Sequence, residues 1–386
     1  MSEWKCYKLN EISSLSNGIN FDKSAYTSGV KLIGVSDFKN RIHPDYDSLQ
    51  EVDSKVVKSG DYLEKGDIVF VRSNGNKELV GRCMIIDRDI PVTYSGFCIK
   101  LHLKDKKRFD PVFFNYLFKT RQFKKSMTGT AVGANIQNLS QSRLGSCEVS
   151  VPDIETQKKI AIILSRYDSL IENYQKQIKL LEEAAQRLYK EWFVDLHFPG
   201  HENTNIIDGI PEGWEKKKVG DLIAKVPRSK QIPTKDYQKE GMIPIIDQSR
   251  DYIAGYTDDI ESKVESNEPY IVFGDHTRVL KYVPFAFAKG ADGTQLIMSN
   301  NLDLMPQCLL FTSLVNIDLS NYSYARHFKY LKEEEIIVPT SLIANVFSKH
   351  VAKWYVKIQQ NREQLRLLTE ARDRLLPKLM SGAIEV

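Results

Sequence analysis

Apolar residues recur in two stretches of this chain with the alternating spacing of four and three residues that is typical of coiled-coil helices. The first stretch runs from 160 to 192, and the pattern returns 187 positions later with two polar interruptions, Asn361 and Arg372. A seam this long predicts a helix that packs along another helix over most of its length. The seam residues are Ile160, Leu164, Tyr167, Ile171, Tyr174, Ile178, Leu181, Ala185, Leu188 and Trp192 in the first copy, and Phe347, Val351, Trp354, Ile358, Leu365, Leu368, Leu375 and Leu379 in the second.

The residues before the two seams repeat as well. The shift that carries one seam onto the other also carries Val151-Pro152 onto Val338-Pro339. Further upstream, an apolar strand pattern runs into a polar turn in GDIVFVRSNGN (66–76) and again in PYIVFGDHTR (269–278). These matches indicate that one structural unit is used twice in tandem.

The repeat predicts two mixed α/β globular domains, each followed by a long helix, with a linker rich in Gly, Pro, Asn and acidic residues between the halves. Two tandem copies tend to pair about an approximate two-fold axis, which makes the two helices antiparallel. Each seam spans roughly 50 Å at about 1.5 Å per residue, so we expect the domains at opposite ends of an antiparallel coiled coil. The expected boundaries are 1–150 and 214–336 for the globular domains, 151–197 and 337–386 for the helices, and 198–213 for the linker.

Three residues in the second helix need separate explanations. A polar side chain at a seam position fixes the register of a coiled coil, or it stays uncovered where a partner protein docks, and both interpretations are open for Asn361 and Arg372. Pro377, in the closing stretch LLPKLMSGAIEV (375–386), is expected to kink or end the helix. In an antiparallel pair this stretch lies beside the start of the first helix, near 151–160. It is therefore expected to close one half of the chain onto the other.

The charge balance permits nucleic acid as a partner without requiring it. The chain has 54 Lys and Arg against 50 Asp and Glu, a formal net charge of +4. Between 100 and 143, ten cations stand against two acids with aromatic residues interleaved, which fits a packed aromatic core with cations facing phosphates; a solvated helix face explains the cations equally well. The five cysteines lack CxxC spacing, and no run of 18 apolar residues occurs, so we expect a cytoplasmic protein with neither disulfides nor a membrane span.

Residue patterns that could carry chemistry are few. The sequence has no Asn/Asp-Pro-Pro-Tyr/Phe motif of an adenine methyltransferase, no GxGxxG turn and no GxxxxGK[ST] loop. The spacing of Asp45 from Asp53-Ser54-Lys55 mimics a metal-dependent nuclease core, but the interval is short and no apolar strand carries it. His197 and His201 fit a linker, because proline and glycine separate them, and Glu333-Glu334-Glu335 fits a solvated turn. We therefore expect neither catalysis nor a bound metal.

Four stretches of the chain resemble the DNA-specificity (S) subunits of type I restriction-modification systems. They are the helical segment that begins VPDIETQKKIAIILSRYDSL, the phrase IPEGW, the strand and turn VFGDHTR, and the ending RLLPKLMSGAIEV. The resemblance extends over essentially the whole chain. It implies that each globular domain is a target recognition domain for one half of a split DNA sequence.

The same resemblance implies a set of partners. The coiled coil would fix the gap between the half-sites and dock two methyltransferase (M) subunits, which bind S-adenosylmethionine and methylate adenine N6. Motor-nuclease (R) subunits, with ATP and magnesium, would add cleavage of unmodified double-stranded DNA. The S subunit itself binds no cofactor and does no chemistry in this scheme.

Loop side chains of Arg, Lys, Asn, Gln and His are the expected readers of DNA, because they offer paired donors or acceptors in the major groove. A capped turn or a phosphate contact explains each single residue as well as base reading does, so the prediction concerns clusters. The clusters are Arg72, Asn74, Asn76 and Lys77 with Asn135, Gln137, Asn138, Gln141 and Arg143 in the first domain, and His276, Arg278, Lys281 and Lys289 with Arg326, His327 and Lys329 in the second.

Two other functions are compatible with the residues. A coiled-coil scaffold with two protein-binding heads would show no sequence preference on DNA and only a shallow salt dependence. A self-sufficient nuclease would cleave unmethylated DNA with magnesium and no partner.

Overall fold

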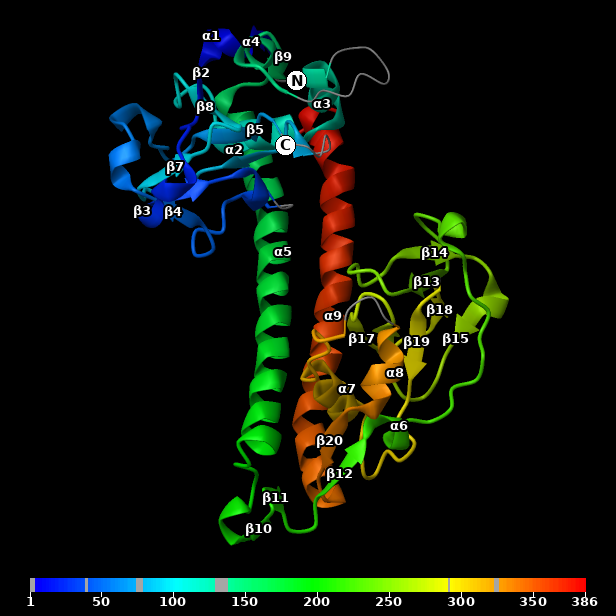
Figure 1. The fold of residues 1–386 in the computed structure, drawn as a ribbon. Helices are drawn as coiled ribbons and strands as arrows, with labels where there is room; N and C mark the ends of the chain where they lie inside the picture. Colours follow the sequence, from blue (N-terminus) through cyan, green and yellow to red (C-terminus); the bar gives the residue numbers. More distant parts are fainter. Residues whose placement is uncertain (1–3, 39–40, 74–78, 129–137, 291, 323–325) are drawn as a thin grey trace. The chain divides into compact units, whose positions relative to one another are not determined.

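The computed structural model describes residues 4–38, 41–73, 79–128, 138–290, 292–322 and 326–386 (Figure 1). The chain forms two compact units: unit 1 comprises Met1–Glu172 and Arg366–Val386, and unit 2 comprises Asn173–Leu365. The two long helices α5 (Ile154–Tyr189) and α9 (Ser341–Met380) each contribute to both units. Unit 1 is therefore built from both ends of the chain. Among the described residues, no helix combines the length and apolar character needed to cross a membrane.

Unit 1 contains two small sheets and a separate strand pair. Besides the long helices, its elements are β1 (Lys5–Lys8), α1 (Leu9–Ile12), β2 (Ser13–Asn17), β3 (Tyr26–Ile33), β4 (Gln50–Val52), β5 (Ile68–Val71), β6 (Cys83–Ile85), β7 (Val92–Tyr94), β8 (Cys98–Leu103), α2 (Pro111–Lys119), α3 (Arg121–Thr128), α4 (Gln141–Gly145) and β9 (Glu148–Val151). The sheets have the orders β2-β8-β5-β6 and β4-β3-β7, and β1 pairs with β9. β5 is buried along its whole length, which fits its run of β-branched and aromatic residues.

Besides the long helices, unit 2 is likewise built from short strands and short helices. They are a π-helical turn (Lys190–Val194), β10 (Ile206–Ile207), β11 (Ile210–Pro211), β12 (Glu215–Lys218), α6 (Val219–Leu222), β13 (Ile243–Ile246), β14 (Gly255–Thr257), β15 (Lys263–Val264), β16 (Tyr270–Gly274), β17 (Leu280–Val283), β18 (Phe287–Lys289), β19 (Thr294–Ile297), α7 (Gln307–Val315), α8 (His327–Glu333) and β20 (Glu335–Val338). Its sheets have the orders β14-β13-β18-β15 and β17-β16-β19, with separate pairs β12-β20 and β10-β11. The predicted linker thus holds a small hairpin, which turns at Asp208 and Gly209 with positive φ angles of 51° and 76°.

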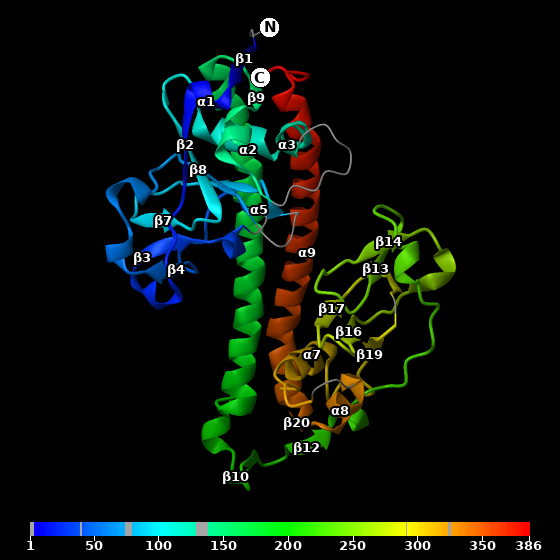
Figure 2. The same cartoon turned by 45° about the horizontal axis from the view of Figure 1, so that its top comes forward.

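The two units share a set of strand pairings, and Figure 2 shows β3 beside β4 in unit 1 and β13 beside β14 in unit 2. In unit 1, β5 pairs antiparallel with β6 and β8, and in unit 2, β16 pairs in the same way with β17 and β19. β3 pairs antiparallel with β4 and parallel with β7, which β13 repeats with β14 and β18. The pairs β1–β9 and β12–β20 are equivalent as well. The tandem repeat of two mixed α/β domains with long helices is confirmed.

The long helices pack start against end inside each unit (Figure 1). In unit 1, Ile160 near the start of α5 shares a core with Leu379 near the end of α9. In unit 2, the ring of Tyr189 at the end of α5 lies 6.5 Å from that of Phe347 near the start of α9. Two helices that meet in this way run antiparallel, which is consistent with the predicted coiled coil.

A side-chain cap sets the start of α5. The Asp153 carboxylate accepts hydrogen bonds from the backbone N–H groups of Thr156 and Glu155, both at 3.0 Å, and from the Thr156 hydroxyl at 2.8 Å. The hydrogen bonds from Thr156, and to a smaller extent the bond from Glu155, hold the pKa of the Asp153 carboxyl below its usual range. An aspartate at the N-cap satisfies backbone donors that have no partner inside the helix.

α9 passes through Pro377 and continues to Met380, and Gly382 then turns the chain with a φ of 71°. Of the two outcomes expected at Pro377, a kink or an end of the helix, the end is therefore wrong. A proline costs about 3 kcal/mol in a helix interior, mainly through one lost hydrogen bond and one clash. Burial of Leu379 and Met380, just beyond it, stabilises by about 1.5–3 kcal/mol per side chain and outweighs that cost.

The last residues of the chain pack on unit 1. A Cβ atom at Gly382 would lie 3.0 Å from the indole nitrogen of Trp4, so the tail passes closely over that ring. The Lys159 ammonium, on the first turns of α5, donates to the carbonyl of Val386 at 3.2 Å. The expectation that the closing stretch lies beside the start of the first helix is confirmed.

A charge pair with a buried carboxylate and a half-buried arginine joins three helices in unit 1. Arg372 on α9 lies 2.5 Å from the carboxylate of Asp168 on α5, which also accepts a hydrogen bond of 2.6 Å from the hydroxyl of Tyr116 on α2. Burial, and then the charge of Asp168, raise the pKa of the Tyr116 hydroxyl, so this group stays a donor. Arg372 is thus bonded inside the chain, as the register interpretation requires.

Unit 2 makes the equivalent contact without charge. Tyr355 stands 187 positions after Asp168, and Thr312 has the same place in α7 as Tyr116 has in α2. Their hydroxyl oxygens lie 3.1 Å apart. The other polar seam residue, Asn361, is fully buried and donates to the Gln177 side chain at 3.1 Å.

We expect Arg372→Ala to lower the free energy of unfolding by about 3–5 kcal/mol, because the substitution leaves the Asp168 carboxylate buried without its cation. Tyr355→Phe removes only a neutral hydrogen bond and should cost about 1 kcal/mol. Urea denaturation of the two variants measures both values. The double variant Asp168→Leu with Arg372→Met should recover most of the loss, since a packed apolar pair replaces the charges. Equal losses in Arg372→Ala and Tyr355→Phe would contradict the assigned role of the pair.

Candidate nucleic-acid interface

In unit 1, three segments meet at the end of β5. The backbone N–H of Arg72, directly after β5, donates at 2.7 Å to the carbonyl of Phe97, in the turn between β7 and β8. The N–H of Leu139 donates to the carbonyl of Arg72 at 2.8 Å, and Ser73 forms a β-bridge with Asn138. The structure therefore brings together the two clusters predicted for this domain. Five of their members lie outside the described residues: Asn74, Asn76, Lys77, Asn135 and Gln137.

The same meeting of segments occurs at the end of β16 in unit 2. The N–H of Asp275, directly after β16, donates at 2.7 Å to the carbonyl of Gly293, in the turn between β18 and β19. The N–H of His327, at the start of α8, donates to the carbonyl of Asp275 at 2.9 Å. The predicted clusters around His276 and around Arg326 therefore also adjoin.

A further loop, which the sequence analysis missed, joins the site in unit 2. Gln248 follows β13; its amide donates to the carbonyl of Asp292 at 2.8 Å and accepts from the N–H of His276 at 3.1 Å. The hydroxyl of Thr277 donates to the Gln248 carbonyl at 2.6 Å. Arg250 is exposed at the tip of this loop. The polar run DQSRD after an apolar strand was the available signal.

The predicted DNA-reading residues within the described part of the chain differ in exposure, and three of the arginines donate hydrogen bonds within their own domain. The Arg72 guanidinium donates to the carbonyl of Gly96 at 3.4 Å, that of Arg278 to the carbonyl of Leu319 at 3.0 Å, and that of Arg143 to the carbonyl of Met127. A guanidinium has five N–H donors, so one such bond leaves donors for DNA. Exposed members are Asn138, His276, Arg278, Arg326 and Lys329, and half-buried members are Arg72, Gln141, Arg143 and Lys289.

Lys281 is not a surface reader, which corrects the prediction. Its side chain points inward from β17 and the residue is only 4% exposed. The ammonium donates to the carbonyls of Asp247 at 2.8 Å and Asp251 at 2.5 Å and lies 3.8 Å from the Asp247 carboxylate. Burial lowers the pKa of Lys281 to about 8. Lys281 therefore links β17 to the loop after β13 by hydrogen bonds.

His327 is also unsuited to base reading, for the same reason. The residue is buried, and its two ring nitrogens lie 2.8 Å from the carbonyl oxygens of Asp275 and Tyr322. Both polar atoms of the ring are thus engaged within unit 2. His327 ties the start of α8 to the end of β16.

The basic run between 100 and 143 divides into packed and exposed parts. Its aromatic residues pack in the core of unit 1, as predicted: Phe109, Phe113, Phe114, Tyr116, Phe118 and Phe123. Four of its lysines donate to backbone carbonyls of their own domain: Lys100, Lys104, Lys106 and Lys119. Arg121 and Lys124 on α3 are exposed and suit phosphate contacts better.

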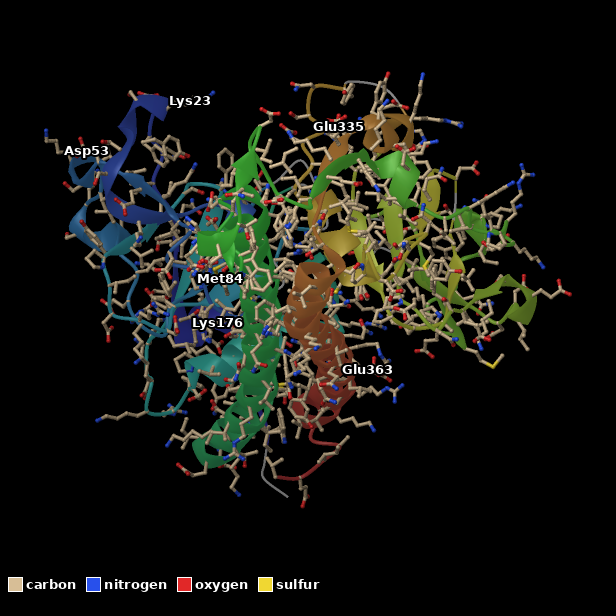
Figure 3. The ribbon with its side chains drawn as sticks, turned by 90° about the horizontal axis from the view of Figure 1, so that it is seen from below. Lys23, Asp53, Met84, Lys176, Glu335 and Glu363 are labelled. Carbon is tan, nitrogen blue, oxygen red and sulfur yellow. The ribbon has the colours of Figure 1, made fainter. Side chains whose placement is uncertain are left out.

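The nuclease-like and histidine spacings serve local structure. The Asp53 carboxylate accepts from the N–H of Lys55 at 2.9 Å as the cap of a short turn, on the same edge of unit 1 as Lys23 (Figure 3). Asp45 pairs with Arg41 at 2.8 Å. His201 bonds the carbonyl of Phe198 at 2.9 Å. Over the ranges that the structure describes, no three His, Cys, Asp or Glu side chains gather as a metal site requires.

The lowered pKa of Lys281 predicts that the stability of the protein depends on pH. Between pH 8 and about 10.5 the unfolded chain binds a proton at this lysine and the folded chain does not, so stability rises with pH through that window. The difference in unfolding free energy between the wild-type protein and Lys281→Met should therefore grow by up to about 3 kcal/mol from pH 8 to pH 10.5 in favour of wild type. Urea denaturation at several pH values measures it, with the exposed Lys329→Met as control. A difference independent of pH would contradict the buried position.

Comparisons with known proteins agree with the geometry. A family model described as "Type I restriction modification DNA specificity domain" matches residues 1–183. The chain is 32% identical over 298 residues, 70% of this chain and 68% of the relative, to the type I restriction enzyme MjaIX specificity subunit of Methanocaldococcus jannaschii. It is 23% identical to the HindI specificity subunit of Haemophilus influenzae, with 100% of each chain covered.

A solved structure shares the fold. The S subunit of a type I restriction-modification system from M. genitalium superposes with a TM-score of 0.65 at 16% identity, over 98% of this chain and 96% of that one. This likeness agrees with two mixed α/β units and long helices. It confirms the predicted fold. The sequence relatives confirm the family: the chain belongs to the family of type I restriction enzyme specificity subunits.

Proposed function

We propose that each unit reads one half of a bipartite duplex DNA target through the loops at the end of its central strand, β5 in unit 1 and β16 in unit 2. The observation that carries this proposal is one framework that occurs twice with different side chains at equivalent places. Directly after the central strand, unit 1 has Arg72 and unit 2 has Asp275. A shared framework with divergent loops suits a chain that reads two different sequences.

The proposed contacts follow the exposed faces of these loops. Arg, Asn, Gln and His side chains there are suited to base edges, while Arg326 and Lys329 at the start of α8 are suited to phosphates. The proposed set retains the predicted residues apart from Lys281 and His327 and adds Arg250 from the loop after β13.

The long helices supply the proposed spacing and assembly. The seam residues are used to pack the two helices against each other inside each unit. We therefore assign the contacts with M subunits to apolar side chains of the helices that remain exposed. These are Ile162, Leu170 and Leu180 on α5 and Leu342, Val356 and Leu367 on α9. We assign the docking of two M subunits to the helices 151–197 and 337–386, joined through the linker 198–213, with recognition domains at 1–150 and 214–336. The M subunits supply S-adenosylmethionine and adenine N6 methylation, R subunits with ATP and magnesium supply cleavage, and the assembly acts in the cytoplasm.

Co-expression with an M subunit of the same family of systems, followed by mapping of N6-methyladenine in the host genome, tests this function. We expect methylation at a split motif with a gap of fixed length, because two separate units read the two halves. Replacing residues 1–150 by the corresponding domain of another family member should alter one half of the motif and leave the other unchanged. An uninterrupted motif, or a change in both halves, would contradict the proposal, and methylation without sequence preference would favour a scaffold.

A further inference from the structure

The turn between β7 and β8 carries a phenylalanine whose ring is left in solvent. Phe97 is 62% exposed, although its neighbours in the framework, Tyr94 and Cys98, are fully buried. Burial of such a ring stabilises a protein by about 1.5–3 kcal/mol. The free protein lacks that stabilisation at Phe97, and the complex with a partner would gain it if the partner surface covered the ring.

The backbone holds Phe97 in a fixed place. Its carbonyl accepts hydrogen bonds from the N–H groups of Arg72 at 2.7 Å and Ser73 at 3.3 Å. The preceding Gly96 donates to the carbonyl of Ile19 at 2.7 Å. A ring presented on a backbone fixed from two sides loses little conformational freedom when it is covered, which favours binding.

Phe97 has an equivalent position in unit 2. The bond of 2.7 Å from Arg72 to Phe97 corresponds to the bond of 2.7 Å from Asp275 to Gly293, each directly after the central strand of its sheet. Unit 2 therefore has a glycine where unit 1 has an aromatic ring.

The space above that glycine is occupied by polar groups. Gly293 has a φ of 82°, and a Cβ atom there would lie 2.8 Å from both the Gln248 amide nitrogen and Cδ2 of the His276 ring. His276 is exposed, and its backbone N–H donates to the Gln248 side chain at 3.1 Å. Gln248 is itself fixed by its bond to the carbonyl of Asp292 at 2.8 Å. An imidazole thus stands in unit 2 close to where the phenyl ring projects in unit 1.

Resting on the function proposed above, we propose that this shared position contacts a base in each half-site. Phe97 makes an apolar contact with a base edge that carries a methyl group, as thymine does in the major groove, and His276 makes a polar contact with a base edge. Gln248 acts as a positioning residue, since it touches His276 rather than projecting from the tip. The backbone of Phe97 is bonded to those of Arg72 and Ser73, and Ser73 is bridged to Asn138, so polar residues adjoin this position, which suits DNA better than an apolar protein surface.

The test uses the complete chain in complex with its M partner and a library of duplexes in which each base pair of both half-sites is varied singly. Methylation of adenine N6 is measured for each duplex with wild type, Phe97→Ala and His276→Ala. Phe97→Ala should reduce discrimination at one or two adjacent base pairs of the first half-site by about fivefold or more. His276→Ala should do so in the second half-site alone. Phe97→Leu keeps an apolar side chain and should retain part of the preference.

Controls separate this inference from the proposed function. Tyr26→Ala removes another exposed aromatic ring of unit 1, 47% exposed, and should leave every base preference unchanged. A uniform loss of methylation on all duplexes in Phe97→Ala would assign the ring to folding or to a protein partner and overturn the inference. Unchanged base preferences in both variants would also overturn it, while the bipartite motif of the wild type would still support the proposed function. A wild type without a bipartite preference would overturn the proposed function itself.

Discussion

Unit 1 depends on apolar contacts between the two ends of the chain. Leu379 and Met380, at the end of α9, are buried in the same core as Ile160 and Leu164 of α5. Each such side chain stabilises by about 1.5–3 kcal/mol when buried, so the first domain is completed only when the last helix returns to it. This requirement explains why α9 continues through Pro377. It also couples the first recognition loops to the register of the two helices.

The contact between a short domain helix and a long helix occurs in both units, but different side chains form it. At the equivalent contact between domain helix and long helix, unit 1 uses the carboxylate of Asp168 and unit 2 uses two neutral hydroxyls, those of Tyr355 and Thr312. Arg372 completes the charge pair in unit 1, whereas the position 187 residues before it is the fully buried Ala185, which has no room for a cation. The start of α5 is therefore matched to the end of α9, and a second copy of α5 would leave Asp168 without its cation. The polar seam residues thus favour pairing within one chain.

Periodicity made the long helices and the repeat predictable, because a 4-3 seam and a buried strand pattern are local properties of the sequence. The recognition loops were predictable only in part. The clusters after β5 and β16 follow a strand directly, so the sequence marks them, but the meeting of Arg72 with Phe97 and Leu139 joins segments distant along the chain. Lys281 was predicted as a reader because lysine offers hydrogen-bond donors to base edges. β17 is instead buried from Lys281 to Val283, and the Lys281 ammonium donates to carbonyls of the loop after β13. Such pairings arise from tertiary structure, which no local pattern records.

Hydrogen exchange of the full chain, followed by mass spectrometry, tests most directly whether the two ends form one core. Leu379→Asp places a charge in that core, whereas Leu367→Asp makes the same change on the same helix at a position that is 44% exposed. The account predicts that Leu379→Asp accelerates exchange in peptides that cover α2 and the first half of α5, while peptides that cover α7 in unit 2 keep their protection. Leu367→Asp should leave both sets protected. Unchanged protection of α2 and the first half of α5 in Leu379→Asp would contradict the claim that the end of the chain completes unit 1.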